Sequence, residues 1–417
     1  MTWDRVRGAA GALAGQVTLA AGSLVLQVVA ARGLGSEGLG HFALMFGYVV
    51  MATAVSTGLV GDSLTVLDRR HPAIRSGLLT CAALTIGVAV AGAFLLALPS
   101  QGPAVASVLA VATAAFMVAD LLRRTLMACL RFWSLVLADG LGLLAAVTLL
   151  AVAQVTAGLE LGHVVAALAV AQATAGAVAW RCLPREERRP ARVGSAGITA
   201  VVRFGGWRAL QQFVRPTTLN AVRWLVLVTT GVAAVGELEA ARVFVAPAML
   251  LVQGLASYLF ASYAAAQTDP VPELLRRADH GAAAMLTGCA LLAGTAALAA
   301  PELGPLLTGD RFTLPTVAVL GWGVYAASCA AVLPYGSLAA VLGAPAQVFL
   351  LRLLDAAVAL LVTALALALW GMPFAWVPWL LSGGSFLGGY LCRRLLLAPR
   401  SAGAAVPRPA LTSVGRR

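Results

Sequence analysis

Residues 77 to 98 read GLLTCAALTIGVAVAGAFLLAL, a run of 22 positions without a charged side chain. A helix of about 20 apolar residues crosses the roughly 30 Å hydrocarbon core of a bilayer and satisfies its backbone hydrogen bonds internally. The run therefore predicts a transmembrane helix.

Runs of the same kind recur about twelve times along the 417 residues. The chain is 60% hydrophobic and 11% charged, whereas about a quarter of the residues of a soluble domain are charged. The sequence therefore predicts an all-α polytopic membrane protein with about 12 transmembrane helices. The predicted spans are 8–31, 41–66, 77–98, 103–122, 133–154, 162–180, 205–231, 239–265, 281–300, 314–341, 348–370 and 375–397.

A long polar segment in the middle of the chain predicts two six-helix lobes. The predicted parts are an N-terminal lobe over 1–180, a basic cytoplasmic linker over 181–204, a C-terminal lobe over 205–400 and a basic cytoplasmic tail over 401–417. A weak internal resemblance supports this division, because segments 33–38 and 231–236 both begin and end with glycine, at a constant offset of 198. Repeats separated by six spans share one orientation, which predicts a pseudo-twofold axis along the membrane normal.

The arginines predict the topology. All 29 basic residues are arginine, and nearly all of those outside the spans lie in alternate connections. Because positive residues accumulate in cytoplasmic loops, both termini are predicted to be cytoplasmic, in a protein of the cell membrane. The formal charge of +12 is then explained by topology and an anionic inner leaflet, and no nucleic-acid partner is expected.

Several kinds of chemistry have no signature in the chain. We find no phosphate-binding P-loop, nucleophile elbow or His-Glu-x-x-His motif. The six cysteines form no Cys-x-x-Cys pair, and the four histidines fall in separate loops. The sequence therefore predicts no metal site, no cofactor and no enzymatic activity.

The seventh predicted span, 205–231, contains arginines, whereas most of the other arginines lie outside the predicted spans. At about 100° per residue, Arg208, Gln212, Arg215 and Arg223 fall within an arc of roughly 80°. At 1.5 Å per residue from the cytoplasmic interface, Arg215 is predicted at a depth of about 12 Å and Arg223 at a depth of about 24 Å. An arginine at mid-bilayer costs roughly 2.5 to 3.5 kcal/mol, so this face is predicted to line a polar cavity.

Two further features accompany this arginine stripe. Pro216 follows Arg215 and removes a backbone hydrogen bond, so a bend is expected there. On the first span, Gln16, Ser23 and Gln27 share one face and are predicted to line the same cavity. Guanidinium groups suit pyrophosphate, because they are permanently charged and planar.

Structural explanations compete with this site. Arg215 could form an ion pair with Asp139 or Asp355, and these acids, with Asp62, are also candidates for ion coupling. Gln16 and Gln27 could serve interhelical hydrogen bonding. The glycines of the last span favour close packing over a site. They are Gly383, Gly384, Gly388 and Gly389.

Four motifs fall at matching places in the twelve-span pattern. They are RGLGSEGLGHFAL at 32–44, VGELEAAR at 235–242, LLTGDRF at 306–312 and SLAAVLGAPAQ at 337–347. In order and position they resemble motifs of the lipid-linked polysaccharide exporters (Wzx-type O-antigen and teichoic-acid translocases) of the multidrug/oligosaccharidyl-lipid/polysaccharide flippase superfamily. The resemblance covers nearly the whole chain.

The resemblance implies a two-lobe exporter that works by alternating access, with a polyprenyl-pyrophosphate-linked glycan as cargo. Its partners would be this lipid-linked glycan, membrane lipids and, as candidates, polysaccharide assembly enzymes. Two other functions compete: a drug/cation antiporter of the same fold, and a membrane polysaccharide polymerase or glycosyltransferase.

Overall fold

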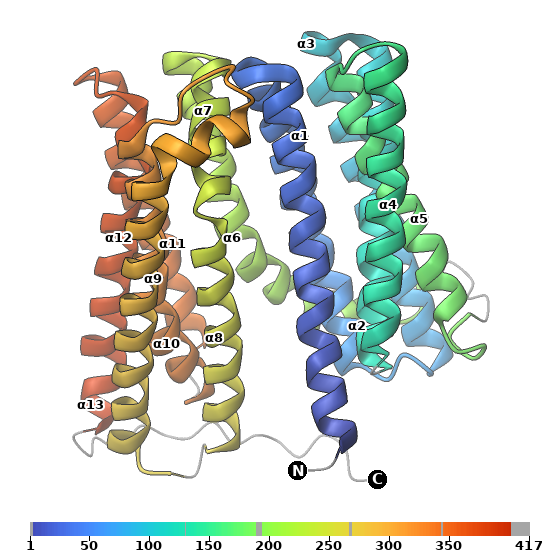
Figure 1. Cartoon of the computed structure of the whole chain (residues 1–417). Helices are drawn as coiled ribbons and strands as arrows, with labels where there is room; N and C mark the ends of the chain where they lie inside the picture. Colours follow the sequence, from blue (N-terminus) through green and yellow to red (C-terminus); the bar gives the residue numbers. More distant parts are fainter. Residues whose placement is uncertain (1–2, 130, 189–193, 267–268, 343–344, 402–417) are drawn as a thin grey trace. The chain divides into compact units, whose positions relative to one another are not determined.

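The computed structural model describes residues 3–129, 131–188, 194–266, 269–342 and 345–401, which are almost entirely helical and contain no strand (Figure 1). This confirms the all-α prediction. The elements are α1 (Trp3–Ser56), η1 (Thr57–Gly61), α2 (Asp62–Val66), α3 (Pro72–Ala128), α4 (Phe132–Thr156), α5 (Leu161–Cys182), α6 (Ile198–Thr230), α7 (Val232–Phe244), α8 (Ala246–Ala265), α9 (Val271–Thr308), α10 (Thr316–Val341), α11 (Pro345–Ala368), η2 (Phe374–Trp376), α12 (Val377–Leu391), η3 (Cys392–Leu397) and α13 (Ala398–Ser401). Seven of the described helices are long and apolar enough to cross a membrane.

Two of these helices each hold two predicted spans. α1 has 54 residues and α3 has 57, which at 1.5 Å per residue is about 80 Å or more and far exceeds a bilayer. Each is broken by one non-helical glycine, Gly35 (φ 73°) in α1 and Gly102 (φ 77°) in α3. The breaks fall between the first and second and between the third and fourth predicted spans.

The chain forms two compact units. We call Met1–Ala240 with Leu307–Phe312 the N-terminal unit, and Ala241–Leu306 with Thr313–Arg417 the C-terminal unit. This division differs from the predicted lobe boundary, because α6 lies in the N-terminal unit although its span was assigned to the second lobe. The physical reason is that α6 packs along α1, η1 and α3, with the closest contacts at glycine.

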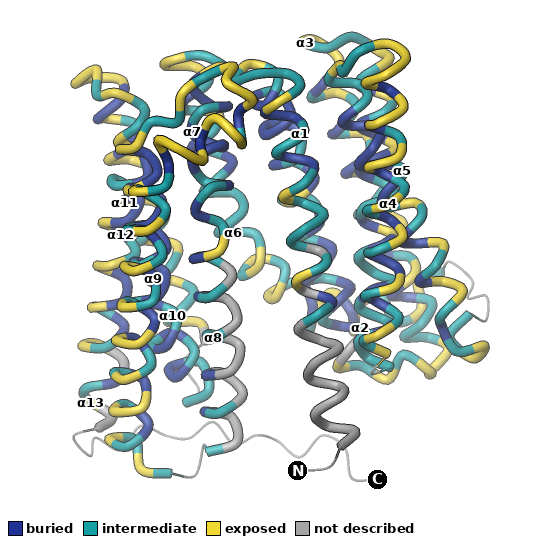
Figure 2. Tube along the Cα trace, viewed as in Figure 1, coloured by how far each residue is buried: buried dark blue, intermediate teal, exposed yellow. Residues whose placement is uncertain are grey.

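Small residues bring the helices of the N-terminal unit together. α4 and α5 lie side by side, and α5 also packs on α3 (Figure 1). Gly142 of α4 lies directly against the Ala171 carbonyl of α5, where a Cβ would collide. Figure 2 shows exposed residues repeating along α4. The exposed leucines of this helix include Leu137, Leu141 and Leu144. Such an apolar exposed face suits contact with lipid.

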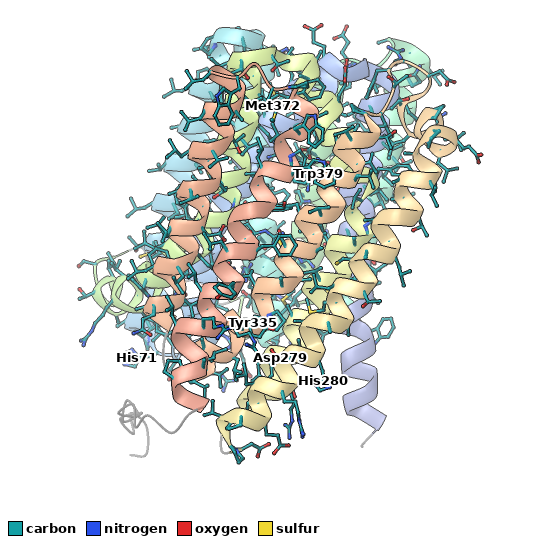
Figure 3. The ribbon with its side chains drawn as sticks, turned by 90° about the vertical axis from the view of Figure 1, so that its left-hand side faces the viewer. His71, Asp279, His280, Tyr335, Met372 and Trp379 are labelled. Atoms are coloured by element: carbon teal, nitrogen blue, oxygen red, sulfur yellow. The ribbon has the colours of Figure 1, made fainter. Side chains whose placement is uncertain are left out.

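A carboxylate joins three elements of the C-terminal unit. Asp279 of α9 accepts two hydrogen bonds from Arg393 of η3, each 2.9 Å long, and one of 2.8 Å from the Tyr335 hydroxyl of α10. Figure 3 shows Asp279 and Tyr335 near one another at one end of the helices. At the other end, the Trp379 indole donates a 2.9 Å hydrogen bond to the Val317 carbonyl.

Candidate functional site

The predicted arginine stripe lies on a helix that continues through proline. α6 extends from Ile198 to Thr230 with Pro216 inside it. Because proline has no N–H, the Gln212 carbonyl cannot receive the usual hydrogen bond from position 216. Gln212 is exposed, and Arg215 is half-buried. The helix therefore has a weakened turn beside its central arginine.

Arg208 lies at one end of this stripe and forms a solvent-exposed ion pair. Its Nε donates a 2.9 Å hydrogen bond to Asp62, the first residue of α2, and its Nη1 donates one of 3.1 Å to Gln211. The Arg208 side chain is 45% exposed and the Asp62 side chain 19%. Exposed pairs of this kind contribute about 0 to 1 kcal/mol. The guanidinium of Arg208 is therefore held loosely.

Arg223 lies two turns beyond Arg215 and forms a buried ion pair. Its Nε and Nη2 donate hydrogen bonds of 3.2 and 3.0 Å to Glu239 of α7. The two side chains are only 11% and 4% exposed. Glu239 lies inside the motif at 235–242, but its pairing with Arg223 was not predicted from the sequence. Spacing alone could not show that α7 turns back beside α6.

Asp139 has an arginine partner other than the one considered for it. Its Oδ2 lies 3.2 Å from the Arg123 Nη2 of α3, and both side chains are almost fully buried. The alternative in which Asp139 pairs with Arg215 is therefore corrected to a pairing of Asp139 with Arg123. The other acid considered, Asp355, lies in the C-terminal unit.

Two polar residues of the first predicted span are hydrogen-bonded to each other. Gln27 donates hydrogen bonds to the Ser23 hydroxyl (3.0 Å) and the Ser23 carbonyl (3.2 Å), and its side chain is buried. The Gln16 side chain lies outside the described residues. Their cavity role remains a prediction.

A continuous contact joins α1 and η1 to α6 and α7, and we call it the glycine seam. It is defined by Gly40, Gly47 and Gly58 on the first side and by Gly205 and Gly236 on the second. A Cβ added at any of these positions would collide with the facing segment.

The contacts show how the two sides of the glycine seam run. Gly58 faces the backbone of Ala209, Gly47 faces the side chains of Asn220 and Arg223, and Gly40 faces Gly236. The residue numbers rise on one side as they fall on the other, so the two segments are antiparallel. From Gly40 to Gly58 the seam covers about 27 Å at 1.5 Å per residue, close to the thickness of a hydrocarbon core.

Polar atoms without a partner lie along the same helices. Among the described residues, Ser56 Oγ, Thr217 Oγ1 and Asn220 Oδ1 are buried and have no hydrogen-bond partner. Asn220 and Ser56 are only 5% and 1% exposed. Since buried polar groups are nearly always hydrogen-bonded, these atoms mark positions where water or a polar ligand would be stabilised.

The π-helical turn η1 places a further polar network beside the Arg208 end. Thr57 donates a 3.2 Å hydrogen bond to Asp120, and Arg124 donates to both Asp120 (2.8 Å) and Thr57 (2.9 Å). Turns of this type often occur at functional sites. This network was not predicted from the sequence, because nothing in the local pattern indicates a π-helix.

Comparisons with known proteins identify the architecture. No family model matches the sequence, and no curated protein matches it. An inward-facing multidrug-resistance MATE family transporter of the MOP superfamily is similar over 93% of this chain and 96% of its own, with a TM-score of 0.75 and 14% identity. The chain has the MATE fold.

Other solved structures with the MATE fold agree. An outward-facing MATE transporter has a TM-score of 0.65 at 14% identity, over 95% of each chain. A MOP superfamily transporter from Pyrococcus furiosus, described as having a binding pocket of reverse polarity, has a TM-score of 0.68 at 13% identity, over 95% of each chain. At this identity the likeness establishes the fold, and the cargo has to be argued from the residues.

Proposed function

We propose that this multi-pass membrane protein is a transporter that flips a polyprenyl-pyrophosphate-linked oligosaccharide or polysaccharide precursor across the cell membrane by alternating access. The observation that carries the proposal is one helix of a MATE fold, α6, with Arg208, Arg215 and Arg223 on it. In this proposal both termini are cytoplasmic, and the cargo moves from the inner to the outer leaflet.

The three arginines have different roles in the proposal. Arg215, in the middle of the stripe, contacts the phosphate, because a permanently charged guanidinium suits pyrophosphate even when partly desolvated. Arg208 receives the head group first, since its exposed pairing with Asp62 is easily exchanged for phosphate. Arg223 holds α6 to α7 through Glu239.

The polar groups of the first span and of the glycine seam support a cargo that carries sugars. Ser23, Gln27 and Asn220 offer hydroxyl and amide groups, which pair with sugar hydroxyls. Gln16 belongs to the same proposed lining. The prenyl tail needs no such groups, because it can stay in lipid while the head group crosses.

A drug/cation antiporter is the second candidate function, since the similar structures include multidrug transporters. A cation pathway needs acidic groups that are available to the cation. Near α6, however, Asp62 and Glu239 are each bonded to an arginine of that helix, which favours an anionic cargo. The Pyrococcus furiosus transporter, with its reversed pocket polarity, is a precedent for a change of charge on this fold. For the third candidate, a polymerase or glycosyltransferase, we find no supporting residue among those described.

The test compares two arginines of the same helix in cells. Arg215→Ala is expected to reduce glycan export about tenfold or more, because one charge-assisted hydrogen-bonding group is worth roughly 1.5 to 3 kcal/mol. The lipid-linked glycan should accumulate on the inner leaflet. Arg203→Ala, an exposed position near the start of α6, is the matched control and should export normally. Unchanged export in Arg215→Ala would remove the site assignment, and drug efflux by the wild type would favour the antiporter.

A further inference from the structure

One acidic residue lies about a third of the way along the predicted span 348–370, in the C-terminal unit. Asp355 is the eleventh of the 24 residues of α11, which places it about 15 Å along the helix at 1.5 Å per residue. Ionisable residues within membrane-spanning segments are rare and are candidates for substrate, ion or proton pathways.

The Asp355 carboxyl group is seated in a notch on α12. Its Oδ1 lies against Gly384 and its Oδ2 against Gly388, one helical turn apart, and a Cβ at Gly384 would collide with Oδ1. Ser385, between the two glycines, donates a hydrogen bond to the carboxylate. Two of the four glycines that the sequence assigned to close packing, Gly384 and Gly388, therefore pack against this acid.

The neighbouring helices bring no charge to the notch. α11 packs on α10 and α12, and neither of these two helices contains a charged residue or a histidine. The nearby cation in sequence, Arg352, lies on α11 itself, with its guanidinium beside Gly336 of α10. Arg393, which follows α12 in η3, is bonded to Asp279.

Asp139 in the N-terminal unit provides the contrast. Asp139 and Asp355 each lie about a third of the way along their predicted spans, 133–154 and 348–370. The Arg123 Nη2 of the preceding helix α3 lies 3.2 Å from the Asp139 Oδ2, so a cation from another helix faces this acid directly. At Asp355 the described residues of α10 and α12 supply glycine Cα groups and a serine hydroxyl, and the cation that acts on the carboxylate is Arg352 of α11 itself. A carboxylate so placed is poorly solvated when ionised and is relieved when a proton neutralises it.

We infer that Asp355 is a proton-binding site, whose carboxylate takes up a proton in the α11–α12 notch and releases it again during the transport cycle. The exchange is a simple protonation: a proton from water on one side adds to the carboxylate, and the same proton leaves to water on the other side. When the group ionises, its charge favours entry of water and looser packing of α11 on α12. The inference deepens the proposed function, because it names the driving ion.

The experiment reads protonation directly and needs no cargo. The full chain in lipid bilayers is moved from about pH 8 to about pH 5, which leaves ordinary exposed carboxylates largely ionised, and infrared difference spectra record the C=O band of protonated carboxyl groups. The band is expected in the wild type and in Asp139→Asn, and is expected to vanish in the near-isosteric Asp355→Asn. An undiminished band in Asp355→Asn overturns the inference.

Two further measurements separate the remaining outcomes. Gly384→Ala removes space beside Oδ1 and should shift the pH at which the band appears, while leaving the acid in place. An unchanged titration in this variant would contradict the notch. Sodium titration at constant pH should leave the spectrum unchanged, and displacement of the proton by sodium would overturn the proton assignment. If the infrared result holds but no lipid-linked glycan is moved, the cargo proposal fails and the proton site stands.

Discussion

At the scale of single residues, the ion pairs at the two ends of α6 have the same chemistry but different surroundings. Arg208 and Asp62 share their pair with water, whereas Arg223 and Glu239 are almost completely buried. Breaking a buried pair leaves one uncompensated charge, which costs about 3 to 5 kcal/mol, while breaking an exposed pair costs little. The same pairing of an arginine with a carboxylate is therefore open to solvent at one end of α6 and enclosed by protein at the other.

Glu239→Gln tests this difference. It should lower the free energy of unfolding by about 3 to 5 kcal/mol, because Arg223 stays buried without its partner charge, as measured by denaturation in detergent. The exposed pair of Arg277 with Glu273 supplies the control, and Glu273→Gln should leave the unfolding midpoint unchanged. If Glu239→Gln also leaves the unfolding midpoint unchanged, the pair does not fasten α6 to α7.

Sequence reasoning at this scale found the arginines but not all their partners. An arginine inside an apolar span is conspicuous, because its cost in lipid is high. Its partner depends on which helices meet: Glu239 pairs with Arg223 across a reversal of the chain, and Asp139 pairs with Arg123 rather than Arg215. Hydropathy and helical period describe one helix at a time and say nothing of such neighbours.

At the scale of elements, the glycine seam explains why α6 lies with the N-terminal unit. Contact with the facing backbone at Gly40, Gly58 and Gly205 leaves no room for a side chain, so the helices approach closely and gain dispersion energy along their length. The chain has 43 glycines, and nothing in the sequence distinguishes those in backbone contact from those facing lipid. The spans were therefore predictable and their partners were not.

Adjacent glycines of α6 test the seam with opposite expectations. Gly205→Ala places a methyl group against the Leu59 carbonyl and should lower the free energy of unfolding by about 1 to 3 kcal/mol. At Gly206 the nearest atom is the Val202 Cγ1, at an ordinary 4.0 Å. Gly206→Ala should therefore be neutral or stabilising by up to about 1 kcal/mol, since alanine favours helix. Thermal unfolding of the two variants in detergent decides the question, and equal effects would argue against the seam.

At the scale of the whole molecule, apolar length was enough to predict a polytopic helical protein. A span must be about 20 residues long whatever it packs against, so each run could be recognised alone, and the glycine breaks in α1 and α3 agree with the predicted divisions. The sequence placed the lobe boundary in the polar segment 181–204. The compact units divide elsewhere, because packing of α6 decides the boundary.

Cysteine labelling tests the predicted orientation of the chain. In a background without the six native cysteines, Asp310→Cys should react with a membrane-impermeant maleimide in intact cells, because the segment around it is predicted to face outward. Arg185→Cys, in the predicted cytoplasmic linker, should react only after permeabilisation. The cysteine-free parent controls for background, and the reverse labelling pattern would invert the topology and the proposed direction of transport.

The break at Gly35 makes the first two spans intolerant of changes in length. The helix resumes at once after this single residue, whose backbone conformation is essentially open only to glycine. One inserted or deleted residue between Gly35 and Gly40 would rotate the following helix by about 100° relative to the corner. Gly40, Gly47 and Gly58 would then point away from α6 together. We therefore expect substitutions to accumulate around this corner during evolution, and the number of residues between it and the glycine seam to stay constant.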